Sequence, residues 1–436
     1  MNRHFLLVSL PFQSHINPTF RLATKLTCAG ARVTLATTVE GLKSRPLVTG
    51  LSYHFFSDGG AAGKPNYVQE IKRVGSIDLK KLLVTKAEEG HKVDFLIYGF
   101  CLPWVAEVAR ELDVPSAFFF FQSAASFSVV YHLFKSDGGI GNSNIDPTGT
   151  MKIPGLPLLR YTEIPTFLLP TDALAAVFQE HIQTLENHPN PVMLVNTFDG
   201  LEEESIELIH GNIKIFSVGP LVSGETEDPF VCDTFKDSDR ETYLRWLDSK
   251  PEKSVVYVSF GSFAKLQKNQ NEEIFQGLIE SGHPFLWVIR NHGEDDDEVR
   301  RFTAEDGGLI VRWCSQVEVL NHVATGCFLT HYGWNSTVES MVSGVPMVGC
   351  PRRADQKMNA KMVEEVWGNG VKAVADGEGV VGREEIKRCL EVVMGGEEIK
   401  RNSEKLKRVA VEAMAEGGSL HRNLKLLFEA LNRVSE

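Results

Sequence analysis

The chain has 436 residues, of which 43% are hydrophobic and 23% are charged, a composition typical of a globular protein. This length exceeds what one hydrophobic core usually serves, so two domains are expected. The formal net charge of −12 argues against a protein that binds nucleic acid, because such proteins carry a basic surface.

Cysteine usage and hydropathy indicate the compartment. The seven cysteines are odd in number and scattered, and none has the spacing of a metal site, so reduced thiols are expected rather than disulfides or zinc. The apolar run at residues 5–10 is too short for a signal peptide. No stretch reaches the roughly 18 apolar residues of a membrane span. The sequence therefore predicts a cytoplasmic protein without a transmembrane segment, and we expect a monomer.

Strands and helices alternate along the first half of the chain. Residues 5–10 predict a buried strand, residues 17–27 an amphipathic helix and residues 31–38 a β-branched strand. This order is a βαβ unit, which implies parallel strands. The pattern recurs further along, with strands expected at 93–98, 116–121, 192–196 and 213–218 and a helix at 103–112.

A polar stretch without periodicity at 221–240 predicts an interdomain linker. A second α/β series follows it, with strands expected at 254–260, 284–289, 309–312, 327–330 and 345–349, a helix at 270–281 and a helical C-terminal stretch at 396–436. The fold class is therefore α/β, with two doubly wound Rossmann-like domains whose ligands lie at the carboxyl ends of the strands.

Residues 313–356 contain most of the side chains that a nucleotide-activated sugar requires. Trp313 begins a turn after a strand, where its indole can stack on a planar base, although a core position is the plainer alternative. Gln316 can both donate and accept toward a base or ribose. Glu339 can accept from two ribose hydroxyls, and Asp355 with Gln356 can bind adjacent hydroxyls of a sugar.

A turn at 331–336 follows the strand expected at 327–330 and opens a helix. The first N–H groups of a helix bind anions, and Gly333 lets the backbone approach a phosphate closely. His331, Asn335 and Ser336 can contact the same anion. The alternative is that Asn335 and Ser336 only cap the helix. Outside the turn, Ser262 comes just after the strand expected at 254–260.

The 44-residue segment 313–356 resembles the plant secondary-product signature of the family-1 UDP-glycosyltransferases, which begins with Trp and ends with Asp-Gln. The stretches at 11–18, 256–262 and 418–424 resemble other motifs of that family. The similarity covers essentially the whole chain and is nearest to the glucosyltransferases of anthocyanins and crocetin.

The resemblance implies the GT-B fold and an inverting transfer from UDP-glucose to a small lipophilic plant metabolite, with no metal and no cofactor. It implies an acceptor domain at 1–220, joined by a C-terminal helix at about 418–436, a linker at 221–240 and a donor domain at 241–417. It also implies which side chains hold the donor: Trp313 the uracil, Gln316 and Glu339 the ribose, Asp355 and Gln356 the sugar, and Ser262, His331, Gly333, Trp334, Asn335 and Ser336 the diphosphate side.

His15 is the candidate general base, because it follows the first strand and imidazole titrates near neutral pH. The alternative is a loop histidine that helps to cap the helix at Asn17. The resembled family usually orients this histidine with an Asp in a Tyr-Asp-x-x-x-x-Trp pattern, and this chain has Gly99 there, between Tyr98 and Trp104. We therefore hypothesise an acidic acceptor, a carboxylic acid or a phenol. The residues expected around it are Phe12, Gly99, Phe100, Phe119 and Phe121.

Two further departures concern the donor segment. Arg353 stands where the family commonly has Trp, and Tyr332 replaces the usual Cys.

A nicotinamide oxidoreductase is excluded, because Pro11-Phe-Gln-Ser-His15 occupies the place of its Gly-x-Gly-x-x-Gly turn. A non-catalytic nucleotide-sugar-binding homologue stays open, and glucose is the expected sugar because the segment ends in Gln356.

Overall fold

The computed structural model describes residues 3–39, 50–61, 63–64, 66–135, 149–209, 211–222, 240–261, 266–289 and 307–434. The chain divides into two compact units. Unit 1 comprises Met1–Tyr161, Thr166–Val222 and Glu412–Glu436, and unit 2 comprises Thr162–Pro165 and Ser223–Val411. Most of the linker predicted at 221–240 lies outside the described residues. No helix in the described ranges combines the length and the hydropathy that crossing a membrane requires.

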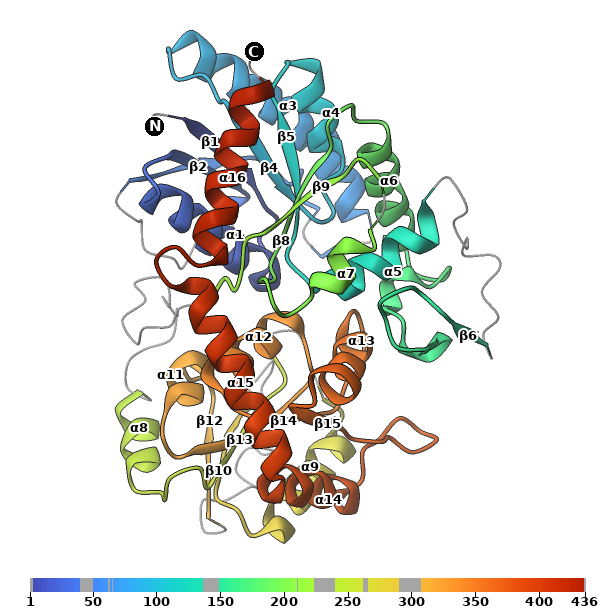
Figure 1. Ribbon diagram of the computed structural model, residues 1–436, viewed down its shortest axis with the longest axis vertical. Helices are drawn as coiled ribbons and strands as arrows, with labels where there is room; N and C mark the ends of the chain where they lie inside the picture. The colour runs from blue at the N-terminus through green and yellow to red at the C-terminus, as the bar shows by residue number, and fades with distance from the viewer. Residues whose placement is uncertain are drawn as a thin grey trace. The chain divides into compact units, whose positions relative to one another are not determined.

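Unit 1 is built on a seven-stranded parallel sheet in the order β3-β2-β1-β4-β5-β8-β9 (Figure 1). Apolar side chains fill both faces of its central strands, as expected for a parallel sheet covered by helices. The strands are β1 (His4–Val8), β2 (Arg32–Thr37), β3 (Leu51–Phe55), β4 (Phe95–Gly99), β5 (Ser116–Phe120), β8 (Val192–Val195) and β9 (Lys214–Ser217). A small antiparallel pair, β6 (Thr150–Met151) and β7 (Leu159–Arg160), lies apart from this sheet.

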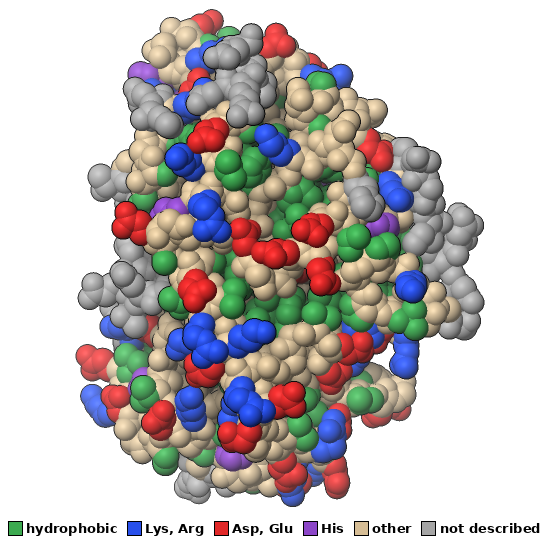
Figure 2. Space-filling view, viewed as in Figure 1, with side chains coloured by type: hydrophobic (Ala, Val, Ile, Leu, Met, Phe, Trp, Pro, Cys, Tyr) green, Lys and Arg blue, Asp and Glu red, His purple; other side chains and the backbone are tan. Residues whose placement is uncertain are grey.

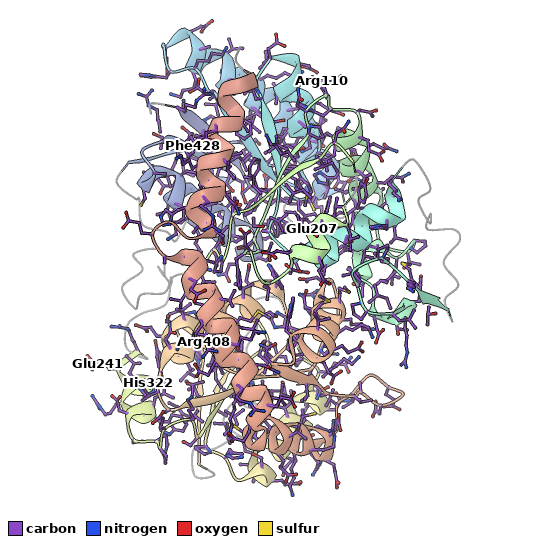
Figure 3. The ribbon with its side chains drawn as sticks, viewed as in Figure 1. Arg110, Glu207, Glu241, His322, Arg408 and Phe428 are labelled. Carbon is purple, nitrogen blue, oxygen red and sulfur yellow. The ribbon has the colours of Figure 1, made fainter. Side chains whose placement is uncertain are left out.

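The described helices of unit 1 are α1 (Gln13–Cys28), α3 (Tyr67–Glu88), α4 (Trp104–Glu111), α5 (Ala124–Phe134), α6 (Leu174–Glu186), α7 (Glu203–Glu207) and α16 (Ser419–Val434). The C-terminal helix α16 joins this unit although its residues come last in the chain (Figure 1). Its Phe428 packs on Phe5 of β1 with ring centroids 5.2 Å apart (Figure 3). Its Asn423 side chain donates to the carbonyl oxygen of Ser217 at 2.9 Å.

Unit 2 has a six-stranded parallel sheet in the order β12-β11-β10-β13-β14-β15. Its strands are β10 (Val255–Ser259), β11 (Phe285–Val288), β12 (Gly308–Val311), β13 (Thr325–Thr330), β14 (Met347–Gly349) and β15 (Gly370–Lys372). Its helices are α8 (Arg240–Asp248), α9 (Lys268–Ser281), α11 (Gln316–Asn321), α12 (Trp334–Ser343), α13 (Gln356–Lys361), α14 (Arg383–Gly395) and most of α15 (Glu397–Met414). Side chains of both charge signs are interspersed on the face that carries α15 (Figure 2).

Both sheets reverse their strand order once, and ligands of doubly wound folds bind at the carboxyl ends of the strands at such a point. In unit 1 the reversal lies between β1 and β4, and in unit 2 between β10 and β13. The expected strands agree with the observed ones to within two residues at each end. The sequence analysis did not predict the strands β3, β6, β7 and β15 or the helices α3, α5, α6, α7, α8, α11, α13 and α14.

One predicted boundary was wrong in a way that concerns the site. Helix α1 begins at Gln13 rather than near residue 17, so Pro18 lies inside it and His15 lies in its first turn. His15 is therefore not a loop residue that caps a helix starting at Asn17.

Candidate active site

His15 lies at the switch point of unit 1, just beyond the carboxyl end of β1, and is only 9% exposed. Three phenylalanine rings surround its imidazole. Phe100 stacks on it at 5.2 Å between centroids and 17° between planes. Phe121 lies at 4.7 Å and Phe12 at 5.6 Å. Ring packing of this kind fixes the plane of the imidazole without a hydrogen bond.

The imidazole has no hydrogen-bond partner at Nδ1 among the described residues, although that atom is buried. Burial lowers the pKa of His15 to about 3, because the cation loses its hydration while nothing nearby compensates its charge. His15 is therefore neutral at ordinary pH. No partner at Nδ1 selects one tautomer, so the ring can present either a lone pair or an N–H.

Gly99, at the end of β4, leaves room beside Phe121, one of the rings that pack on His15. A Cβ added there would lie 3.6 Å from a ring carbon of Phe121 and 3.8 Å from the carbonyl oxygen of Val8, both ordinary contacts. The backbone at Gly99 does not have a positive φ, so glycine is not required by conformation. The position where the resembled family usually has Asp can thus accept a side chain.

Of the five residues expected around the acceptor, Phe119 is placed differently from the others. It is fully buried, and its ring contacts Phe121 at 5.9 Å. Since successive side chains of a strand point to opposite faces, Phe119 shares its face with Phe121 but lies deeper. The structure thus brings Phe12, Phe100 and Phe121 to the imidazole, with Gly99 beside Phe121, and places Phe119 in the layer beneath.

Sequence reasoning missed two rings that support this group. Phe178 of α6 stacks on Phe100 at 4.9 Å, and Phe167 stacks on Phe178 at 4.6 Å. Both come from a region where no motif was recognised. The helical spacing of Phe178 and Ile182 could have indicated a buried helix face, but nothing in the sequence ties that face to His15.

In unit 2 a hydrogen-bonded network joins the first part of the donor segment. Gln316 Nε2 donates to Ser336 Oγ at 2.9 Å and to Glu339 Oε2 at 2.7 Å. The Tyr257 hydroxyl donates to Gln316 Oε1 at 3.4 Å. Three residues expected to hold one ligand are therefore in direct contact. Tyr257, on β10, was not predicted because a strand tyrosine has no distinguishing pattern.

His331 follows β13 at the switch point of unit 2, and two glycines give its ring room. A Cβ on Gly261 or Gly333 would lie within 3 Å of the imidazole, closer than real Cβ contacts allow. Burial and then the nearby Arg353 guanidinium lower the pKa of His331 to about 4, so the ring is neutral. The absence of a side chain at Gly333 thus lets the backbone pack closely against the ring of His331. Ser262, which was also expected to contact the diphosphate, lies outside the described residues.

The turn after His331 differs in detail from expectation. Gly333 is the N-cap of α12, so Asn335 and Ser336 lie inside the first turn of the helix rather than at its N-cap position. Trp334 is 2% exposed and packs on Trp367 at 5.9 Å. Its indole is therefore part of the core, and only its backbone N–H, which donates to the Asp355 carboxylate, reaches the site.

The end of the segment forms a second hydrogen-bonded group. Asn359 Nδ2 donates to Asp355 Oδ2 at 2.7 Å and to the carbonyl oxygen of Tyr332 at 2.9 Å. Gln356 Oε1 accepts from the backbone N–H groups of Arg352 at 2.9 Å and Arg353 at 3.1 Å. These bonds hold both predicted sugar-binding side chains in place. Asn359, one helical turn after Asp355, was missed.

Asp355 is 5% exposed, and burial raises the pKa of its carboxyl group from 3.8 to about 6, against the lowering effect of its hydrogen bonds. Trp313, by contrast, is only partly buried, as stacking on a ligand requires. Among the described residues no group of three or more His, Cys, Asp or Glu side chains is placed to hold a metal ion.

Comparison with known proteins shows the family to which the chain belongs. A family model described as UDP-glucoronosyl and UDP-glucosyl transferase matches residues 195–413. Crocetin glucosyltransferase of Gardenia jasminoides is 41% identical over 98% of this chain and 97% of its own. Anthocyanidin 3-O-glucoside 5-O-glucosyltransferase 1 of Perilla frutescens is 38% identical over 100% of both chains.

A solved structure agrees over the same extent. Os79 from O. sativa in complex with UDP has a TM-score of 0.84 and 31% identity, and the match covers 99% of this chain and 100% of that one. The resemblance seen in the sequence and the GT-B fold with two Rossmann-like domains are confirmed. The chain belongs to the plant UDP-glycosyltransferases and is an enzyme of that family.

Proposed function

We propose that this enzyme transfers glucose from UDP-glucose, with inversion, to a small plant metabolite whose acceptor group is a carboxylic acid or an acidic phenol. His15 is the general base of this proposal. The acceptor oxygen bonds to the anomeric carbon while the bond from that carbon to the UDP oxygen breaks. The acceptor proton, where one remains, passes to the imidazole, and UDP leaves with the bonding electron pair.

The observation that supports an acidic acceptor is the state of His15. An imidazole whose pKa is lowered to about 3 by burial, with Nδ1 unpartnered, is a weak base, because its cation would be buried without a counter-charge. Such a base suits an acceptor that loses its proton easily or arrives ionised. Toward a carboxylate, the other tautomer of the same ring can donate an N–H instead.

The relatives support a glucosyl donor and a small plant metabolite as the acceptor. They are named as glucosyltransferases of crocetin and of an anthocyanidin glucoside, and a UDP complex is known for Os79. In the proposal Trp313 stacks on uracil and Gln316 with Glu339 holds the ribose. Asp355 and the Gln356 amide nitrogen hold glucose, since Gln356 Oε1 is already engaged.

Gly99→Asp tests the acceptor class. We expect it to raise turnover of alkyl alcohol acceptors by about ten-fold or more, because a carboxylate beside His15 stabilises the imidazolium that forms when the alcohol gives up its proton. Turnover of carboxylate acceptors should change little. Initial rates with matched alcohol and carboxylate acceptors measure the difference.

Gly99→Asn is the matched control, because it adds the same volume without the charge. A large gain on carboxylates with none on alcohols would overturn the proposal. Absence of transfer to any acceptor, with UDP-glucose still bound, would favour a non-catalytic nucleotide-sugar-binding homologue.

The pKa of Asp355 gives a second test. Its ionised carboxylate accepts from sugar hydroxyls, so kcat/KM for UDP-glucose should fall by about ten-fold per pH unit below pH 6. Asp355→Asn should lower kcat/KM and remove this acid limb. The raised pKa makes protonation of Asp355 favour folding, a contribution present below 3.8 and lost as pH rises through about 6. Unfolding driven by Asp355 therefore cannot mimic the limb, and an unchanged limb in the variant would contradict the assignment.

The proposal also includes a reaction without a metal or cofactor, a cytoplasmic location and a monomer. The N–H groups at the start of α12 and His331 can offset the charge of the diphosphate. Transfer in the presence of a chelator tests the first point, and sedimentation of the full chain tests the last. Localisation of a tagged chain tests the compartment. The chloroplast is the alternative, because the crocetin relative is named as chloroplastic.

A further inference from the structure

Unit 1 contains a groove of about 660 Å³ whose lining includes none of the proposed acceptor or donor residues. It lies along the edge strand β3, beside the starts of β1 and β2 and beneath α3. His4 and Arg32 open β1 and β2, whereas His15 follows the opposite end of β1. Since a five-residue strand is roughly 15 Å long, the groove and the His15 site are separate. Its volume is that of a small-molecule site.

Positive charge dominates the described lining. Arg32, Lys81 and Lys86 face a single lining carboxylate, Asp78. Asp78 already accepts from the backbone N–H of Ser57 at 3.0 Å, and Lys86 pairs with Glu89 at 2.8 Å. Lys81 makes no ion pair with any described residue. A cationic groove on a chain of net charge −12 concentrates a field that attracts a small anion.

A chain of hydrogen bonds through His91 and His4 holds the guanidinium of Arg32 in position. Arg32 Nη1 donates to His91 Nδ1 at 2.9 Å. The carbonyl oxygen of His91 accepts from Nδ1 of His4 at 2.9 Å, and His4 Nε2 lies 2.8 Å from the Thr34 hydroxyl. His4 is only 4% exposed, so the chain begins in the core. The remaining N–H groups of Arg32 have the planar geometry that binds a carboxylate through two bonds.

The lining also has apolar parts. Tyr53 and Phe55 of β3 and Leu82 of α3 contribute to it, and Phe55 is 48% exposed. An aromatic body covers such side chains, while an inorganic ion does not. We propose that this groove is a second ligand site, distinct from the sites of the transfer reaction, for a small aromatic molecule that carries a carboxylate. The proposal does not depend on which acceptor the enzyme glycosylates.

Calorimetric titration of the full chain with 2-naphthoate tests the site, with the uncharged 2-naphthamide as the matched ligand. The double variant Arg32→Gln, Lys81→Gln should bind 2-naphthoate at this site at least about ten-fold more weakly, because two bonds to a charged group are lost. Lys81→Gln alone leaves the His4–His91–Arg32 chain intact and should show part of the loss. Arg110→Gln, an exposed position on α4 (Figure 3), should bind as the parent does.

The rate of glycosyl transfer shows whether the double variant has lost binding in the groove or in the acceptor site. We expect the double variant to retain the parent rate with a glycosyl acceptor, because the groove is not part of the reaction site. Equal binding of 2-naphthoate by parent and double variant would overturn the proposal, and so would equal affinity for naphthoate and naphthamide. A parallel loss of binding and transfer would assign the naphthoate to the acceptor site and overturn it as well.

Discussion

Replacing His15 with alanine is expected to lower kcat by about 10²–10⁴-fold for uncharged alcohol or phenol acceptors, the range that general base catalysis supplies. For a carboxylate acceptor we expect a loss below about ten-fold, because the nucleophile carries no proton and the imidazole only positions it. The ratio between the two acceptor classes is the measured quantity. It separates proton removal from a general disturbance of the pocket, which would lower both rates alike.

Two controls accompany this comparison. His421→Ala removes an exposed histidine on α16 and should leave both rates unchanged. The pH profile of the parent enzyme is the second control. With the pKa of His15 lowered to about 3 by burial, His15 stays neutral above about pH 4, so no acid limb above that pH should belong to it. Equal losses on both acceptor classes would contradict a base role.

The donor site could be predicted well from the sequence because its parts are close together in the chain. Gln316 lies on α11, and Ser336 and Glu339 lie on α12, the next helix along the chain after β13, so the order of the residues nearly specifies their contacts. What the sequence predicted wrongly was the direction in which a side chain points. Trp334 has the residue type of a ligand contact, but the helix turns its indole into the core against Trp367, and only tertiary packing decides such a direction.

The acceptor site could be predicted only in part, because distant segments build it. His15 was identified through a motif, and the missing carboxylate at Gly99 was apparent from the sequence. The aromatic rings that position the imidazole in place of that carboxylate could not be predicted. Phe100 stacks on the imidazole and is itself backed by Phe178, from a helix that begins 74 residues later in the chain. Phenylalanines carry no pattern that distinguishes a ring beside a base from a ring in the core.

Tyr332, which stands where the resembled family usually has Cys, has a defined structural role in unit 2. Its backbone is left-handed at φ 61°, unusual for a residue with a side chain. Its hydroxyl donates to the carbonyl oxygens of Val371 at 2.9 Å and Met347 at 3.3 Å. Its ring occupies the space over Gly349 where a Cβ would be. The residue beside His331 is therefore anchored to β14 and β15.

Gly349→Ala is expected to destabilise the fold by about 3 kcal/mol, at the upper end of the usual cost of overpacking. The added methyl group would overlap the ring of Tyr332. Neither side can move easily, because Gly349 pairs with Thr330 and Lys372 in the sheet. We also expect weaker UDP binding, since a displaced Tyr332 carries His331 and the start of α12 with it. Denaturant unfolding and UDP titration measure the two effects.

The Tyr332→Cys background isolates the cause, because Cys is the residue that the family usually has after this histidine. There Gly349→Ala should cost less than about 1 kcal/mol, so a double-mutant cycle should show a coupling of about 2 kcal/mol. Gly395→Ala is the matched control, since no atom lies within 4 Å of the position of its added Cβ. It should leave stability nearly unchanged. An equal cost of Gly349→Ala in both backgrounds would mean that the backbone at Gly349, rather than the Tyr332 ring, excludes a side chain.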